Sequence, residues 1–373
     1  MTVLDADGHI FEPEAMFENI EEEYYHRRPV LVELPSDAVP NQANTLWIID
    51  GNAIPKITGR GSTFFPLPKS VSLLSKKIPH EDQTLEDVSA RLRGMDQFDI
   101  DKQVLYPTMF LISGVEDVRL EAALYRAYNT FVGKAAVESG GRLKWTAMVP
   151  WRDPEAAVAE LRRASDLGAS GVFTMGVIFD RQLSDPLFYP VYEAAGDLDL
   201  PICVHLGWGC PSVTSVFAEN QFFCSATIPV IWGFTFAMTS GLLGRFPKLR
   251  MGFIETGAEW IPYAVNQVRR QYEPPTVLRD PSRSRRGIER NYYRDPYDWF
   301  KEGRAFVTFE PEEDVDYLLK HIGEDSLMFS TDYPHGDPSS DETFVGKLRK
   351  RDDISDRTKS KLLGENANRF YRE

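Results

Sequence analysis

The chain has 373 residues, with 42 Lys and Arg against 56 Asp and Glu, so its formal net charge is −14 at pH 7. Hydrophobic residues make up 42% and charged residues 26%, as in a folded globular protein rather than a disordered one. The acidic balance argues against nucleic acid or an anionic membrane as the main partner, since both are bound by clustered Lys and Arg. No apolar run approaches the ~20 residues of a membrane span. We therefore expect neither nucleic acid nor membrane as a partner.

Two further features indicate the compartment. The three cysteines, Cys203, Cys210 and Cys224, are odd in number and confined to one stretch, which argues against a disulfide framework and fits a reducing cytosol. The N-terminus lacks the basic start and apolar core of a signal peptide. We expect a cytoplasmic protein.

Short β-branched runs alternate with helical patterns along most of the chain. Strands are expected at residues 3–6, 103–106, 143–149, 171–174, 201–205, 249–254, 304–309 and 326–330. Between them, helices are expected at residues 85–95 (opened by Thr84), 119–137, 154–167 and 189–196. Alternation of strand and helix implies an α/β protein with a parallel sheet and right-handed crossovers. Eight such units favour a closed (β/α)8 TIM-type barrel, with an open doubly wound sheet as the alternative.

Two segments interrupt this repeat within what we expect to be a single barrel spanning residues 1–373. Residues 11–81 are too many for one loop and contain a hairpin signal, with apolar runs at 45–49 and 53–57 on either side of Asp50-Gly51. Residues 272–300 form a second insertion, rich in Arg, Pro and Tyr. We predict that the first insertion, with its hairpin and helices, caps the barrel mouth. A dimerisation arm or a surface decoration is the alternative.

Three of the six histidines stand at or just beyond the end of an expected strand. His9 follows Asp7 in the first unit, His205 ends the fifth, and His335 lies three residues beyond Asp332 in the eighth. Side chains two apart on a strand share a face, so Asp7 and His9 point the same way. The carboxyl ends of barrel strands converge, which would gather these groups into a site for Zn²⁺, Fe²⁺ or Mn²⁺. The alternative is that each histidine is a hydrogen-bonded structural group.

Three further residues are candidates for the same site. Glu255 ends the sixth expected strand, and a buried acid there is costly unless it is paired or ligates a cation. A salt bridge to an arginine is its alternative role. Glu12 and His80 belong to the first insertion, and the sequence leaves open whether either reaches the site.

These residues occur in motifs that together resemble the amidohydrolase superfamily. The motifs are Asp5-Ala-Asp7-Gly-His9, Gly94-Met-Asp96 with Val104-Leu-Tyr-Pro107, the strand ending at His205, Gly244-Arg-Phe-Pro247 with Phe253-Ile-Glu255, and Ser330-Thr-Asp332-Tyr-Pro-His335. Their order is similar to that of the amidohydrolase-related branch, which includes the aminocarboxymuconate-semialdehyde decarboxylase-like enzymes. The resemblance implies a (β/α)8 barrel with a divalent metal at its C-terminal mouth.

Carried over by motif, the resemblance implies a metal site with two departures from the family pattern. The His-x-His motif of the first strand falls on Asp7-Gly-His9, and the sixth-strand histidine falls on Glu255. The fifth-strand ligand falls on His205 and the eighth-strand aspartate on Asp332. The candidate metal ligands are Asp7, His9, His205, Asp332, Glu255 and His335. The added carboxylates favour Fe²⁺ or Mn²⁺, or two bridged ions, over a lone Zn²⁺.

The leading functional hypothesis is hydrolysis of an ester, amide or thioester of a largely apolar carboxylic acid. A bound metal would lower the pKa of a water, Asp332 or His335 would take its proton, and Glu255 would hold a second metal or steer water. A non-oxidative decarboxylase using the same metal is the alternative, although the loss of the sixth-strand histidine counts against it. A non-catalytic barrel is the third possibility. We expect a small-molecule substrate, one or two Fe, Zn or Mn ions, and a possible homodimer.

Overall fold

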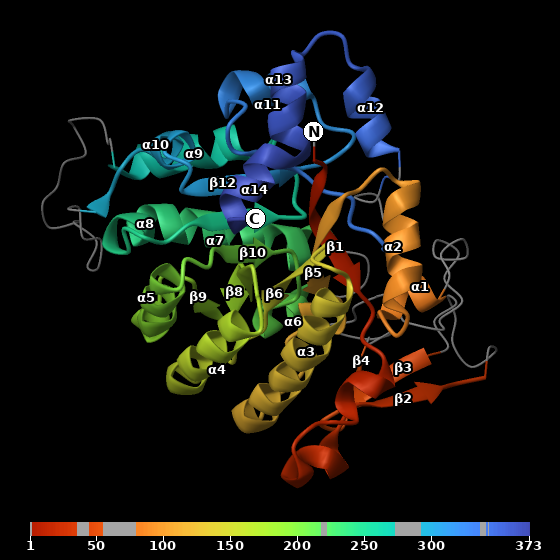
Figure 1. The fold of residues 1–373 in the computed structure, drawn as a ribbon. Helices are drawn as coiled ribbons and strands as arrows, with labels where there is room; N and C mark the ends of the chain where they lie inside the picture. Colours follow the sequence, from red (N-terminus) through yellow and green to blue (C-terminus); the bar gives the residue numbers. More distant parts are fainter. Residues whose placement is uncertain are drawn as a thin grey trace, which may run out of the picture.

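Eight parallel strands form one sheet in the computed structural model, which describes residues 2–35, 45–54, 80–217, 222–272, 292–335, 341 and 343–373. In sheet order the strands are β1 (Leu4–Ile10), β5 (Lys102–Pro107), β6 (Leu143–Ala147), β7 (Gly171–Met175), β10 (Ile202–His205), β11 (Met251–Ile254), β12 (Ala305–Phe309) and β13 (Leu327–Phe329). Each overlaps one of the eight expected strands. The (β/α)8 barrel predicted from the sequence is therefore confirmed (Figure 1).

The sheet closes between its first and last strands at the carboxyl end. The His9 amide donates to the Tyr333 carbonyl at 2.7 Å, and the Asp332 amide donates to the Asp7 carbonyl at 2.9 Å. The buried Asp5 carboxylate adds hydrogen bonds from the amide and hydroxyl of Thr331. The segment that follows β13 is thus fixed directly beside the end of β1.

Helices pack around the outside of the strands (Figure 1). They are α1 (His80–Thr84), α2 (Val88–Gln97), α3 (Val118–Glu138), α4 (Pro154–Asp166), α5 (Tyr189–Asp197), α6 (Pro211–Val216), α7 (Ile228–Thr239), α8 (Leu242–Arg245), α9 (Ile261–Tyr272), α10 (Pro296–Lys301), α11 (Val315–His321), α12 (Phe344–Lys350), α13 (Asp356–Ser360) and α14 (Asn366–Tyr371). Within the described ranges, none of them combines the length and apolar character needed to cross a membrane.

One helix begins later than the sequence pattern indicates. The expected helix 85–95 with Thr84 as its opener is α2, whose N-cap is Asp87. The Asp87 carboxylate accepts the amides of Ser89 and Ala90. Leu85 has φ +58°, a conformation incompatible with a continuous helix, so α1 and α2 are separate.

The first insertion contributes a small antiparallel sheet beside the barrel (Figure 1). Its strands are β2 (Val30–Glu33), β3 (Thr45–Ile49) and β4 (Asn52–Ile54), and β3 and β4 form a hairpin through Asp50-Gly51. β4 begins one residue earlier than expected, and residues 55–57 of the expected strand lie outside the described residues. So do 36–44, 58–79 and 273–291, which make up much of both insertions. The capping role of residues 11–81, and the extent of the insertion at 272–300, stay predictions.

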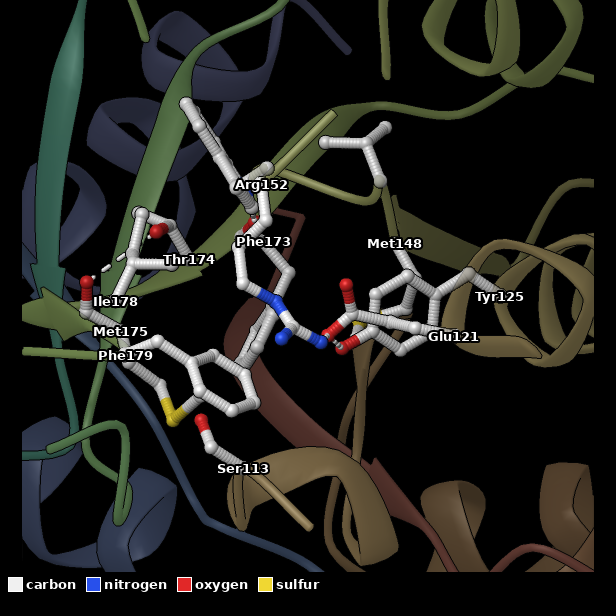
Figure 2. Close-up of a pocket in the computed structure, with 12 residues that line it drawn as sticks. Ser113, Glu121, Tyr125, Met148, Arg152, Phe173, Thr174, Met175, Ile178 and Phe179 are labelled. Atoms are coloured by element: carbon white, nitrogen blue, oxygen red, sulfur yellow. Dashed lines mark hydrogen bonds and ion pairs between the residues drawn. The ribbon is translucent and has the colours of Figure 1, made fainter. Parts of the chain in front are cut away.

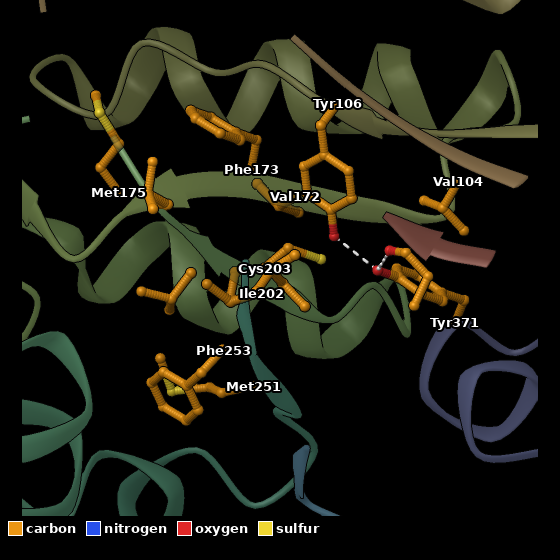
Figure 3. Packing of buried hydrophobic residues seen from close by; sticks show 14 of the residues in the cluster. Val104, Tyr106, Val172, Phe173, Met175, Ile202, Cys203, Met251, Phe253 and Tyr371 are labelled. Carbon is orange, nitrogen blue, oxygen red and sulfur yellow. Dashed lines mark hydrogen bonds between the residues drawn. The ribbon is translucent and has the colours of Figure 1, made fainter. Parts of the chain in front are cut away.

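Apolar and aromatic side chains fill both the barrel interior and the layer between strands and helices (Figure 3). Tyr106 and Phe173 point inward against His205, whereas Phe253 packs outward against Phe234 of α7. All of these are buried, and burying a large apolar side chain contributes about 1.5–3 kcal/mol. The Tyr371 hydroxyl of α14 lies 2.6 Å from the Tyr106 hydroxyl and donates to the Ala6 carbonyl at 2.8 Å. The C-terminal helix is therefore joined to the floor of the barrel, opposite the strand ends that carry the candidate site. All three cysteines are free.

Candidate metal centre

β1 places Asp7 and His9 on its inward face, where both side chains are fully buried. Gly8 between them faces Gln103 so closely that a Cβ at this position would collide with that side chain. The Nδ1 of His9 lies 2.9 Å from the Pro107 carbonyl, which can only accept, so Nδ1 carries the proton. The remaining nitrogen, Nε2, faces the cluster with its lone pair.

β10 presents His205 in the same way. Its Nδ1 donates to the Leu206 carbonyl at 2.8 Å, which leaves Nε2 directed at the acids. That Nε2 lies 3.2 Å from Asp7 Oδ1 and 3.3 Å from Glu255 Oε2. The rings of His9 and His205 are 4.9 Å apart at their centroids. Two imidazoles from different strands therefore direct their Nε2 atoms into one space.

The two remaining acids are held in unusual backbone conformations. Glu255, at the end of β11, has φ +57°, and Asp332, beyond β13, has φ +54°. Such conformations are uncommon for residues other than glycine and cluster at functional sites. The Glu255 amide donates to the Thr308 hydroxyl at 2.8 Å, and Asp332 Oδ1 lies 3.3 Å from His9 Nε2. The strand ends thus turn both carboxylates toward the imidazoles.

His335 lies beside Asp332 with both ring nitrogens engaged. Its Nδ1 is 2.8 Å from Asp332 Oδ1, and its Nε2 is 2.9 Å from the Thr108 hydroxyl. Burial lowers the pKa of His335 well below its ordinary value, so the ring is neutral. A neutral ring that donates to Asp332 from Nδ1 accepts the Thr108 hydroxyl at Nε2. These contacts favour an orienting role for His335, while its role as a ligand stays a prediction.

The six candidate side chains form two overlapping groups that share His9. One group contains Asp7, His9, His205 and Glu255, with ligand atoms all within 4.8 Å of one another, and the other joins His9 to Asp332 and His335. Within the described residues, Asp7 Oδ2 and His9 Nε2 are buried atoms without a hydrogen-bond partner. Such atoms are costly to bury unless a cation takes the missing interaction.

The electrostatics of the cluster suit a cation. Burial raises the pKa of Asp7, but the adjacent imidazoles of His205 and His9 outweigh burial and hold that pKa below its ordinary range. Burial also lowers the pKa of His9, which favours the neutral imidazole that a metal requires. A carboxylate and imidazole donor set therefore fits a divalent ion.

The sequence left the roles of Glu12 and His80 open, and it did not indicate two further residues around this centre, Thr108 and Arg91. Glu12 does not extend to the cluster, because its two oxygens accept the amides of Thr108 and Met109 at 3.0 and 2.8 Å. Thr108 was not singled out, although it directly follows the motif ending at Pro107. The buried Arg91 of α2 donates to the His9 carbonyl, a contact that no local pattern indicates. The side chain of His80 lies outside the described part of the chain.

A search of family models matches one described as "Amidohydrolase" to residues 79–372. The chain belongs to the amidohydrolase family. The match covers most of the barrel, including His205, Glu255, Asp332 and His335.

Among family members, a gamma-resorcylate decarboxylase of Polaromonas sp. is 26% identical over 65% of this chain and 76% of that protein. A 2-amino-3-carboxymuconate-6-semialdehyde decarboxylase of Dictyostelium discoideum is 24% identical over 78% and 77%. These relatives place the chain in the decarboxylase-like branch that the motifs indicated.

Solved structures agree on the fold. An amidohydrolase of Mycobacterium avium subsp. paratuberculosis has a TM-score of 0.78 and 18% identity, covering 99% of each chain. A 5-carboxyvanillate decarboxylase of Novosphingobium aromaticivorans, solved with bound manganese, has a TM-score of 0.67 and 20% identity over 82% of this chain and 86% of that one.

The hydrolase expected from the sequence, and with it a thioesterase, is wrong. Curated relatives of this family member are decarboxylases, and 5-carboxyvanillate and 2,6-dihydroxybenzoate decarboxylases are among the similar structures. The error has a chemical reason. A cage of imidazoles and carboxylates holds a divalent ion equally well for either reaction, so the ligand set alone does not distinguish them. Glu255 in place of histidine was given too much weight against decarboxylation.

Proposed function

We propose that this protein is a metal-dependent non-oxidative decarboxylase of small aromatic or unsaturated acids that carry an oxygen substituent near the carboxylate. The observation that carries the proposal is the buried cage of Asp7, His9, His205 and Glu255 in a chain whose curated relatives are named for decarboxylation. The names of those relatives supply the substrate class.

The proposal includes one divalent ion held by Asp7, His9, His205 and Glu255, with Asp332 beside it. Ligand atoms within 4.8 Å of one another suit a single shared cation. Manganese is our first candidate, because carboxylate-rich sites favour hard ions and the similar 5-carboxyvanillate decarboxylase binds it. When bound, such an ion supplies positive charge that offsets the negative charge of the substrate oxygens.

Decarboxylation requires the protein to deliver one proton. The bond between the carboxylate and the substrate carbon breaks, CO₂ leaves, and the carbon keeps the electron pair and takes a proton. We assign that proton to the carboxyl group of Asp332, whose Oδ1 is held by His335 Nδ1 at 2.8 Å. His335 is in turn fixed by the Thr108 hydroxyl, so the donor is oriented before the substrate binds. All three groups are buried, which limits the access of water to the proton donor.

The experiment is an assay of CO₂ release by the manganese-loaded protein from 2,6-dihydroxybenzoate, 5-carboxyvanillate and simple ortho-hydroxybenzoates. Asp332→Asn should lower kcat by about 100-fold or more, the usual contribution of general acid catalysis. Asp153→Asn is the matched control, because Asp153 only caps α4 and asparagine caps as well. No CO₂ from any of these acids, or full activity in Asp332→Asn, would contradict the proposal.

A small-molecule substrate follows from this proposal. A homodimer, a cytoplasmic location and the absence of nucleic-acid and membrane partners stay predictions.

A further inference from the structure

A small cavity lies beyond the carboxyl end of β7, next to the strand that carries His205 (Figure 2). Its volume is about 20 Å³, which is enough for one water molecule or one hydroxyl group. Most of its wall is apolar and aromatic, and the polar side chains that line it include Ser113, Glu121 and Arg152.

Each of those three side chains keeps one buried polar atom without a hydrogen-bond partner in the described structure. The atoms are Ser113 Oγ, Glu121 Oε2 and Arg152 Nε. Glu121 is only 4% exposed, so its carboxylate is almost entirely removed from solvent. Leaving a buried polar or charged atom unsatisfied is costly, and three such atoms at one cavity point to a missing polar occupant.

The groups are held rigidly by their other atoms. Arg152 donates from Nη1 to the Glu116 carbonyl at 3.0 Å and from Nη2 to the Val115 carbonyl at 2.6 Å, and its guanidinium lies 3.6 Å from the ring centre of Phe179. Glu121 Oε1 lies 3.2 Å from Arg152 Nη2 and accepts the Tyr125 hydroxyl. The vacant hydrogen-bonding positions on Glu121 and Arg152 are therefore fixed before an occupant arrives.

One residue connects this cavity to the metal centre. Phe173 lines the cavity, and its ring centre is 5.8 Å from that of His205. Met175, also in the cavity wall, pairs in register with His205 across β7 and β10. Phe173 thus contacts both the cavity and the imidazole of His205, and the neighbouring strands β7 and β10 carry the two sites.

We propose that this cavity binds a hydroxyl substituent on the ring of the acid that is decarboxylated at the metal centre. This inference rests on the proposed function. A hydroxyl donates to Glu121 Oε2 and accepts from Arg152 Nε or Ser113 at the same time. A methoxy or aldehyde oxygen only accepts hydrogen bonds, and an ammonium group only donates them. None of these groups can therefore pair with Glu121 and Arg152 at the same time. The cavity would therefore select acids that carry a second, distal hydroxyl.

The test compares 2-hydroxybenzoate with 2,4- and 2,5-dihydroxybenzoate as substrates of the manganese-loaded protein. We expect kcat/KM to favour one dihydroxy acid by about tenfold or more, the effect of one charge-assisted hydrogen bond. Glu121→Gln keeps the size of the side chain but replaces the acceptor with an amide donor, and Ser113→Ala is a milder change. Both should bring the ratio toward one.

Glu160→Gln is the matched control. Glu160 is also buried and paired with an arginine, but both of its oxygens accept hydrogen bonds from Arg163 or Asn129. This variant should keep the preference of the wild type. Equal rates on all three acids, or an unchanged ratio in both cavity variants, would overturn the proposal and leave the cavity as the site of a structural water only.

A binding measurement separates this proposal from the proposed function. Phenol, resorcinol and hydroquinone, the products of these acids, are titrated calorimetrically into the manganese-loaded wild type and Glu121→Gln. If no acid is decarboxylated but the wild type alone prefers a diphenol, the proposed function fails and the cavity assignment stands. If acids are decarboxylated without any preference for the second hydroxyl, the proposed function stands and the cavity assignment fails.

Discussion

The two imidazoles at the centre of the cluster are oriented by main-chain carbonyls. His9 donates to Pro107 and His205 to Leu206, so each ring keeps its Nε2 lone pair for a cation. The sequence could indicate that these histidines meet, because strand ends converge in a barrel. It could not indicate their supports, because Pro107 and Arg91 are more than eighty residues from His9 in sequence. Nor could it separate hydrolysis from decarboxylation, since both use such ligands.

At the scale of single residues, the buried carboxyl group of Glu12 predicts how the stability of the folded protein depends on pH. Burial raises the pKa of Glu12 from 4.5 to about 7, although the amides of Thr108 and Met109 oppose the shift. The folded state therefore binds the proton more tightly than the unfolded state, and stability falls as pH rises from 4.5 to about 7. Relative to Glu12→Gln, which stays neutral, the wild type should lose on the order of 3 kcal/mol over that interval. Urea unfolding of metal-free protein at pH 4.5, 6 and 8 measures this difference. A constant difference between the two proteins would contradict the prediction.

Among the secondary-structure elements, the barrel strands could be predicted from the sequence, whereas the exact ends of strands and helices could not. Continuous apolar runs such as residues 202–204 identify strands that are covered on both faces. β1 extends to Ile10, beyond the expected end at residue 6, because β5 and the Tyr333 segment supply hydrogen-bonding partners for its polar residues. The start of α2 at Val88 depends on the left-handed Leu85, which no periodic pattern reveals.

The contact between α14 and the barrel floor can be tested with a single hydroxyl group. Tyr371→Phe leaves the Tyr106 hydroxyl without its acceptor and the Ala6 carbonyl without its side-chain donor, so unfolding should become easier by about 1–3 kcal/mol. Tyr128→Phe is the control. Tyr128 is also fully buried, but within the described residues its hydroxyl has no partner, so removing it should cost little. Equal losses of denaturation midpoint in the two variants would show that the hydrogen bonds of Tyr371 do not hold the helix.

For the molecule as a whole, the candidate site lies where the first and last strands of the barrel meet. The groups that converge there come from β1, from β10, from the residue that follows β11 and from the segment after β13. That last segment closes the sheet through the Asp332 amide and the Tyr333 carbonyl. A cation bound by these groups would connect elements that are distant in sequence and would bind the folded state alone. Binding of that kind stabilises a protein by mass action.

We therefore expect Mn²⁺ to raise the unfolding temperature of metal-depleted protein. At a free ion concentration 100 times the dissociation constant, the gain is about 2.7 kcal/mol, or roughly 2 °C or more for a chain of this length. His205→Ala removes a ligand but keeps the strand, so it should lose both the stoichiometric ion and the thermal shift. His321→Ala, which alters a helix-end histidine outside the cluster, should retain both. Scanning calorimetry with and without Mn²⁺, alongside elemental analysis, decides the question. A shift that persists in His205→Ala would mean that the ion binds elsewhere, and the cage at the end of the barrel would then have no metal role.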